Sequence, residues 1–426
     1  METNVARWDE RLVTGLVFTA TIFALLPPGF SWTDHNDSST FLEGSLGFQL
    51  QWGTLFAVSA FVVARHRALT LANLRAMNPF ILAMLVYSAA SAIWSPVDYV
   101  TIKKVIQFAG LIIFGLAIQA DGKPWTHLFQ VMVAAITAIE FVSAIVAIVN
   151  PSFGIDAYFG YAWRGITSGK NQLGGIGALG TLLWVALWRV NTASRSMFWF
   201  GFGLSLLCVV MSKSSTSATI AALGLFVFWL LRKQHIGSQL WLQRIIVIVG
   251  MVLLVIGHLF FVIEGHFPEA SELVEPFANL FGKNADLTGR VDIWDPLIVE
   301  IWKHWLFGIG YGAFWLGPGS PSQPVLDHFS WIPLQGHNGY LDLLNELGAT
   351  GMLLFAGLLA SQIRSLTRLK LIDREAAALF ASLLVTILFS NVTESSIFKG
   401  VAFYFLLLIL SCISVTSVLN KRRLTK

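Results

Sequence analysis

Long apolar segments, separated by short polar ones, run through most of the chain. Several approach the roughly 20 residues that an α-helix needs to cross a hydrocarbon core about 30 Å thick. We predict twelve membrane-spanning helices, at residues 11–28, 46–64, 77–94, 101–120, 127–149, 171–189, 197–212, 214–231, 241–263, 337–360, 375–391 and 397–417. The pattern therefore predicts an all-α fold, a polytopic membrane helical bundle, with one long polar interruption.

That interruption, residues 264–336, divides the chain into spans 1–9 (residues 1–263), a large loop, and spans 10–12 (residues 337–426). Residues 271–281 have apolar side chains at helical spacing. After Arg290, one predicted helix face carries Trp294, Leu297, Ile298, Ile301, Trp302 and Trp305, and the other Asp292, Asp295, Glu300 and Lys303. Amphipathic helices of this kind lie in the membrane interface, with tryptophans at headgroup level. We expect the loop to cover the bundle as a lid.

Composition and charge agree with a membrane protein. Of 426 residues, 55% are hydrophobic and 12% charged, against about 25% charged in soluble domains. The net charge of +4 is spread over many helix ends, so it does not indicate nucleic acid as a partner. Cys208 and Cys412 lie in hydrophobic runs and are expected to be core residues, not a disulfide or a metal site. Residues 7–11 lead into an apolar run with no small-residue cleavage site, so no cleavable signal is predicted.

The distribution of lysine and arginine predicts the orientation. With both termini cytoplasmic, 19 of the 28 basic residues fall in inner segments, as the positive-inside rule requires. Nine remain outside: Lys103, Lys104, Arg164, Lys170, Lys213, Lys283, Arg290, Lys303 and Lys399. For Lys103 and Lys104 the simplest explanation is that they reach the outer headgroups. Glu140 falls inside the fifth span, where it is either a structural contact between helices or part of a site.

Two outer turns combine cations with hydroxyl groups. Arg164 and Lys170 flank a glycine- and hydroxyl-rich turn at the start of a helix, where backbone N–H groups favour anions. This turn is not a nucleotide P-loop, because only three residues separate its glycines and Asn171 follows the lysine. Lys213 lies within a run of serines that either caps the next helix or offers donors to a phosphate. For the turn that carries Arg164 and Lys170, the alternative to an anion site is a simple turn at the membrane interface.

His337 begins the tenth predicted span. On a helix, Asn338, Asp342, Asn345 and Glu346 share one face and predict a polar stripe that runs inward from the outer mouth. A lone histidine is commonly a hydrogen-bonded structural residue. This one follows an arginine-bearing loop and precedes a carboxylate stripe, which favours a catalytic role.

Other chemistries lack their motifs. The chain has no Asp-x-Asp pair, no cluster at metal-ligand spacing and no Gly-x-Ser-x-Gly elbow. What remains is several outer cations, one histidine and many aromatic rings. Arginine makes paired, charge-assisted bonds to diphosphate. A lipid-linked diphosphoryl sugar fits this set, because its leaving group is already activated and no cofactor or metal is expected.

Four motifs carry a resemblance. They are Arg164-Gly165 with Gly169-Lys170-Asn171-Gln172-Leu173-Gly174; Leu287-Thr288-Gly289-Arg290-Val291-Asp292-Ile293-Trp294; Phe307-Gly308-Ile309-Gly310-Tyr311-Gly312; and His337-Asn338-Gly339-Tyr340-Leu341-Asp342 with Glu346-Leu347-Gly348. With these motifs in this order, the chain resembles the O-antigen ligase/polymerase superfamily. Within that superfamily it is most similar to the ExoQ-type exopolysaccharide polymerases.

The resemblance implies a helical bundle in the bacterial inner membrane with a large periplasmic loop. It also implies metal-independent transfer of a glycan from an undecaprenyl-diphosphate-linked oligosaccharide to a hydroxyl of an acceptor glycan. His337 matches the family's proposed general base, and Arg290 and Arg164 match arginines assigned to the donor diphosphate. Lys213 matches a position that is often basic, whereas Gly169 replaces a common histidine.

Three functions remain open from the sequence. A polymerase joins lipid-linked repeat units, an O-antigen ligase transfers polysaccharide to lipid A–core, and a transporter or flippase moves the glycan without chemistry. We favour the polymerase, with His337 as the base, Arg290, Arg164, Lys213 and Lys170 on the diphosphate, and Asn338, Asp342 and Glu346 as supporting or acceptor-binding residues. A transporter would predict charges along the spans and an internal repeat, and neither is evident.

Overall fold

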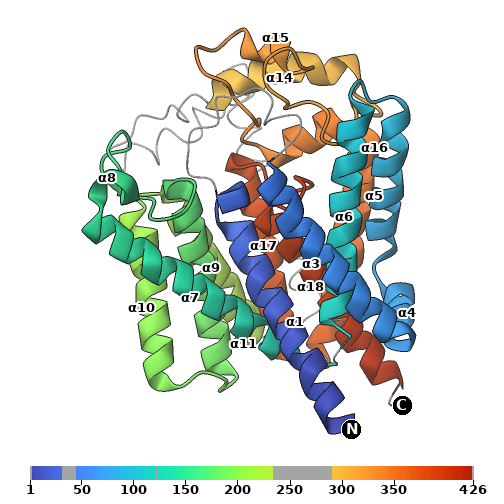
Figure 1. Cartoon of the computed structure of the whole chain (residues 1–426), viewed down its shortest axis with the longest axis vertical. Coiled ribbons are helices and arrows are strands. Elements are labelled where there is room, and N and C mark those ends of the chain that lie inside the picture. Colours follow the sequence, from blue (N-terminus) through green and yellow to red (C-terminus); the bar gives the residue numbers. More distant parts are fainter. Residues whose placement is uncertain (1, 31–44, 121, 234–289, 425–426) are drawn as a thin grey trace, which may run out of the picture.

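A computed structural model describes residues 2–30, 45–120, 122–233 and 290–424 (Figure 1). Its elements are α1 (Glu2–Leu25), η1 (Pro28–Phe30), α3 (Leu46–Arg65), α4 (Arg67–Ala76), α5 (Pro79–Ala90), η2 (Ser91–Ile93), α6 (Asp98–Ile118), α7 (Trp125–Val149), α8 (Pro151–Gly154), β1 (Ile155–Asp156), β2 (Ala162–Trp163), α9 (Lys170–Arg189), α10 (Arg195–Met211), α11 (Ser215–Lys233), α14 (Arg290–Lys303), α15 (Gln323–Leu326), α16 (Gly339–Lys370), α17 (Arg374–Thr393) and α18 (Phe403–Leu424). The short antiparallel pair of β1 and β2 is the one sheet in the described residues. The predicted all-α class is confirmed.

Seven described helices are long and apolar enough to cross a membrane: α3, α6, α7, α11, α16, α17 and α18. The pair α4 and α5, bent by 89°, would make an eighth span, and α10 is a shorter apolar helix. The predicted span at 241–263 lies outside the described residues, and each of the other predicted spans falls on a helix. The protein is therefore a polytopic helical membrane protein, and the count of twelve stays a prediction.

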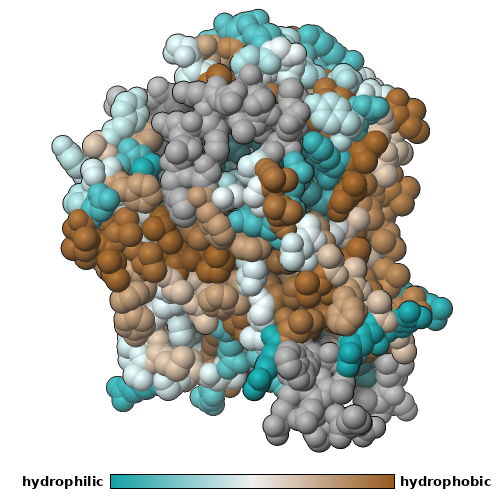
Figure 2. All heavy atoms as spheres, viewed as in Figure 1, coloured by the Kyte–Doolittle hydropathy of each residue, from teal (hydrophilic) through white to brown (hydrophobic). Residues whose placement is uncertain are grey.

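Both ends of the chain lie at one end of the bundle, and α8, α14 and α15 lie at the other (Figure 1). A predominantly apolar zone crosses the middle of the visible face, and hydrophilic residues gather toward both ends (Figure 2). An even number of crossings gives this arrangement. We call the end with α8, α14 and α15 the outer end; that it faces the periplasm stays a prediction.

Capping residues define several helix starts. Ser45 accepts a hydrogen bond from the Phe48 N–H at the start of α3, and Asp373 accepts one from the Ala376 N–H at the start of α17. Two predicted boundaries were wrong. Helix α16 begins at Gly339, because Asn338 is its N-cap and His337 has φ 48°. Helix α18 begins at Phe403 and not at residue 397, so residues 394–402 form a connection at the outer end.

Helix α16 is broken at Gly348, whose φ of 64° and ψ of −169° are not helical. Loop residues next to the break complete its hydrogen bonds. The N–H groups of Ala349 and Thr350 donate to the carbonyls of Trp305 and Leu306, and those of Ile309 and Gly310 donate to Asn345 and Glu346. A Cβ at Gly348 would lie 2.5 Å from the Gly308 nitrogen, so only glycine allows this approach. The loop is therefore joined to the helix.

Glu140 makes a buried polar contact between two helices of the bundle. The Ser205 hydroxyl in α10 donates to Glu140 Oε2 in α7 at 2.8 Å, and both side chains are fully buried. This favours the interpretation of Glu140 as a contact between helices. Cys208 and Cys412 are free thiols in the core, as predicted.

Candidate active site

Helix α14 packs against α16 at the outer end (Figure 1). Its buried face, with Ile293, Leu297 and Ile301, packs on Phe314 and Val325. The Trp294 indole N–H donates to the Gly336 carbonyl at 2.8 Å. Helix α14 is therefore fixed to the residue that directly precedes His337.

The other side of α14 exposes apolar side chains. Val299 is 59% exposed and Trp302 70% exposed, and the apolar surface continues through Trp305 and Phe307. This surface supports the predicted position in a membrane interface. Glu300, predicted on the polar face of this helix, is buried: it is 7% exposed, because it lies one turn from buried Leu297 and beside Ile301, and it accepts from Lys303 Nζ at 2.5 Å. The helix predicted at 271–281 lies outside the described residues.

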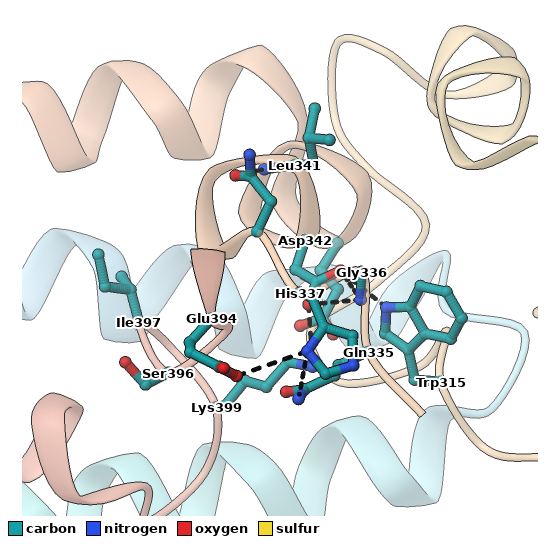
Figure 3. Close-up of polar contacts among 12 residues, drawn as sticks. Trp315, Gln335, Gly336, His337, Leu341, Asp342, Glu394, Ser396, Ile397 and Lys399 are labelled. Carbon is teal, nitrogen blue, oxygen red and sulfur yellow. Dashed lines mark hydrogen bonds and ion pairs between the residues drawn. The ribbon is translucent and has the colours of Figure 1, made fainter. Parts of the chain in front are cut away.

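The His337 ring is held by two side chains (Figure 3). Its Nδ1 lies 3.4 Å from Glu394 Oε2 and 3.2 Å from Gln335 Nε2. A protonated Nδ1 would face the carboxylate, whereas the Gln335 amide N–H donates to an unprotonated Nδ1, so the two partners favour different tautomers. The backbone of His337 is left-handed, with φ 48°, which is uncommon outside glycine and persists only where the surroundings fix it. The ring is therefore fixed in position beside a carboxylate that can stabilise its protonated form.

Glu394 links His337 to the start of α9. Its Oε1 accepts from Asn171 Nδ2 at 3.1 Å, while Oε2 faces His337. Its backbone carbonyl accepts from the Gly339 N–H at 3.1 Å, at the first residue of α16. Three helices, α9, α16 and α17, therefore meet at this residue.

The sequence analysis missed Glu394. A signal was present: a carboxylate in the polar run 393–396, between two predicted spans and on the predicted outer side. Its partner is 57 residues earlier in the chain (394 − 337), so the pairing itself has no local signature.

The polar stripe of α16 exists, but most of it is occupied within the protein. Asn338 Oδ1 accepts from the N–H groups of Tyr340 and Leu341. Asp342 accepts from the Trp315 indole at 2.8 Å and from the Gly336 N–H at 3.1 Å, and pairs with Lys399 at 2.9 Å (Figure 3). These contacts hold the chain on both sides of His337.

The deeper residues of the stripe hold the loop. Asn345 lies 3.0 Å from His304 Nε2, and Glu346 Oε2 accepts from the Gly312 N–H at 2.8 Å. Asn345 is fully buried and Glu346 is 7% exposed. In the structure Asp342 and Asn345 are therefore structural supports, while Glu346 also faces a cavity beside α6.

Three predicted cations gather around residues 153–170. Arg164 Nε donates to the Phe153 carbonyl at 2.8 Å, with its guanidinium 5.3 Å from the Phe153 ring centroid. Lys170 lies 4.7 Å from the Phe159 ring centroid, and Lys213 Nζ donates to the neighbouring Gly160 carbonyl at 2.6 Å. The structure therefore brings Arg164, Lys170 and Lys213 to one outer segment.

Lys213 has a left-handed backbone, with φ 49°, between α10 and α11. The hydroxyl of Ser214 accepts from the Ser217 N–H and from its hydroxyl, so the serines cap α11. A Cβ on Gly174 would lie 2.5 Å from Ser212 Oγ and 2.6 Å from Ser217 Oγ, so α9 packs closely on this turn. The capping interpretation of the serines fits, and Lys213 projects from the turn to the segment described above.

Contacts connect the cation segment to His337. Lys170 and Asn171 are adjacent on α9, and Asn171 binds the carboxylate that faces His337. Arg290 is the first residue of α14, one helical turn before Trp294, which binds the Gly336 carbonyl. Within the described part of the chain, no group of three His, Cys, Asp or Glu residues has a metal-binding arrangement.

Part of the chain is similar to a known family. Residues 200–356 match the family model described as O-antigen ligase, a region that includes Lys213, Arg290, His337, Asp342 and Glu346. Arg164, Lys170 and Glu394 lie outside that region.

The chain is also similar to the exopolysaccharide production protein ExoQ of Rhizobium meliloti (strain 1021). The two sequences are 23% identical over 300 residues. The match covers 66% of this chain and 63% of the length of ExoQ. The two matches support the resemblance predicted from the sequence, to the O-antigen ligase/polymerase superfamily and within it to ExoQ-type proteins.

Proposed function

We propose that the protein is a glycosyltransferase that polymerises exopolysaccharide or O-antigen repeat units at the periplasmic face of the inner membrane. The donor is an undecaprenyl-diphosphate-linked oligosaccharide, and the acceptor is a hydroxyl of a second lipid-linked repeat unit. The observation that carries the proposal is the His337 ring held at Nδ1 by Glu394. Similarity to an exopolysaccharide production protein favours the polymerase.

His337 Nε2 takes the proton of the acceptor hydroxyl, and the oxygen attacks the anomeric carbon of the donor. The bond from that carbon to the diphosphate breaks, and the lipid diphosphate leaves with the electron pair. Attack from the far side inverts the configuration of this carbon. The Glu394 carboxylate stabilises the imidazolium that forms.

Arg164, Lys170, Lys213 and Arg290 bind the diphosphate and stabilise the charge that it gains as it leaves. The contacts of Arg164, Lys170 and Lys213 with residues 153–160 support one shared site for these three. No metal is assigned a step, because the cations supply the positive charge.

An O-antigen ligase is the second candidate, because the matched family model carries that description. The two functions share donor and base and differ in acceptor: a ligase transfers the finished polysaccharide once, to lipid A–core. A transporter, the candidate from another class, would need neither His337 nor Glu394 as a chemical group.

Reconstitution in proteoliposomes with a defined lipid-linked repeat unit tests the proposal. A polymerase gives a ladder of products, a ligase gives one shift when lipid A–core is added, and a transporter moves the donor across the bilayer without new bonds. We expect His337→Ala and Arg290→Ala to abolish the ladder at normal expression. Lys303→Ala, which removes an outer cation that pairs with Glu300, is the control. Full activity of His337→Ala would overturn the assignment.

A further inference from the structure

A cavity of about 390 Å³ lies at the outer end of the bundle, between α3 and α6 and against the loop. That volume lies within the range of about 300–1,000 Å³ that is common for small-molecule sites. Its walls include Trp52, Phe56, Lys104, Gln107, Trp315 and Lys399. The described donor cations Arg164, Lys170 and Lys213 do not line it. The mechanism above leaves this cavity without a role.

The ammonium of Lys104 is available to a ligand. In the described residues it makes no hydrogen bond or ion pair, although Glu346 and Lys399 are near enough to affect it electrostatically. A Cβ on Gly312 would lie 2.6 Å from Lys104 Cγ, and one on Gly400 would lie 3.4 Å from Lys104 Nζ. Both glycines have positive φ, of 70° and 50°. Two glycines therefore leave room for the lysine.

Gln107 adds an unused acceptor. Its Oε1 is buried and has no hydrogen-bond partner in the described structure. Buried polar atoms without partners are rare and call for an explanation. Gln107 also lines the cavity, so its side chain borders any ligand there.

The cavity adjoins the reaction centre through Lys399. Lys399 Nζ pairs with Asp342 Oδ2 at 2.9 Å, and Asp342 accepts from the Gly336 N–H, next to His337 (Figure 3). Asn171 and Glu394 approach His337 from α9 and α17. A ligand in the cavity would therefore approach from elements other than those that hold the donor cations.

We infer that this cavity is the acceptor subsite and that it takes a sugar residue carrying a carboxylate. The inference rests on the proposed transferase function and names its acceptor class. The partly exposed indole of Trp315 suits a sugar ring, the amide of Gln107 suits hydroxyls, and Lys104 suits the acid.

Lysines predominate among the charged side chains that line the cavity. Lys103, Lys104 and Lys399 line it together with Glu346, and Lys399 is paired with Asp342. This excess of lysine favours an anionic ligand over a neutral one.

Saturation-transfer NMR titration of the full-length protein in phosphatidylcholine nanodiscs tests the cavity directly. The probes are cellobiouronic acid and cellobiose, which differ in one carboxylate. We expect the acid to bind about tenfold more tightly, as a hydrogen bond between charged groups predicts. Lys104→Gln removes the difference, Lys104→Arg keeps it, and Lys303→Gln, outside the cavity, has no effect. Gln107→Leu weakens both sugars.

Equal affinity of the two sugars for the wild type, or an unchanged preference in Lys104→Gln, would overturn the inference. Displacement of the acid by phosphatidylglycerol in the nanodisc would also overturn it, in favour of a lipid headgroup. In the transferase assay, Lys104→Gln should raise the KM for an acidic acceptor and leave the donor KM unchanged. A wild type that transfers but shows no acid preference refutes the cavity assignment alone, whereas acid binding without transfer refutes the proposed function.

Discussion

Replacing Glu394 by glutamine tests most directly whether Glu394 supports His337 as the base. The substitution keeps the side-chain length, the backbone bond to the Gly339 N–H and an oxygen for Asn171. It removes the negative charge that faces His337 Nδ1. The new amide can also donate to Nδ1, as the Gln335 amide already does, and no carboxylate is then left to favour the tautomer in which Nε2 accepts the substrate proton.

The size of the effect follows from the geometry. Glu394 Oε2 and His337 Nδ1 are 3.4 Å apart, and their side chains are 29% and 24% exposed. At such separations two unit charges interact by about 1 kcal/mol in water and by about 4 kcal/mol near a protein surface. A hydrogen bond to a charged group contributes about 1.5–3 kcal/mol. We take this range for the lost stabilisation of the imidazolium, which corresponds to a kcat about 10- to 150-fold lower.

The assay is polymerisation of a lipid-linked repeat unit in proteoliposomes, with kcat and the donor KM measured separately. Glu394 acts through His337, so kcat should fall and the donor KM should stay constant. Glu394→Asp should recover part of the activity, because it restores the charge. Asp327→Asn, which removes an exposed carboxylate at the end of α15, is the control. A Glu394→Gln enzyme with kcat within about twofold of wild type would refute the reasoning, since its loss would be below about 0.5 kcal/mol.

Three further predictions concern stability, measured by thermal unfolding in detergent. Gly348→Ala should destabilise the protein by more than about 1 kcal/mol, because its φ is 64° and its Cβ would meet the loop backbone. The control is Gly203→Ala, in α10 with open space around it. It should leave the stability unchanged or raise it by about 1 kcal/mol. Asn338→Ala removes two capping bonds and should cost about 1 kcal/mol. Asp342→Asn leaves Lys399 without its carboxylate and should cost up to about 3 kcal/mol. Adding Lys399→Met should recover most of that loss, and equal stability of the single and double variants would contradict it.

Local patterns predicted the helices well, because a membrane span is recorded in the apolar residues of the span itself. The turn at Lys213 and the capping by Ser214 were visible for the same reason. The sequence suggested the convergence of Arg164, Lys170 and Lys213 only through the order of the motifs and their predicted location on the outer side. The contacts of these residues with residues 153–160 supply the geometry.

Features that depend on distant partners were not predictable. The stretch around Gly348 reads as an uninterrupted helix, and its break is set by a loop segment about 40 residues earlier. Glu300 belongs to the polar face of the predicted helix, yet its side chain is 7% exposed in the structure. Asp342 reads as a lining carboxylate, and three donors from the loop and the α17–α18 connection saturate it.

The junction between the loop and the break in α16 restricts how substrates travel. Lifting residues 305–310 would open four backbone hydrogen bonds, each with a net value of about 0.5–1.5 kcal/mol and more where water is absent. Tyr87 and Trp94 also donate to the carbonyls of Phe307 and Gly308. We therefore expect residues 305–310 to stay fixed to α16 like a roof. In the proposed transferase, a lipid-linked donor would then have to enter sideways between helices, and the product would have to leave around this segment.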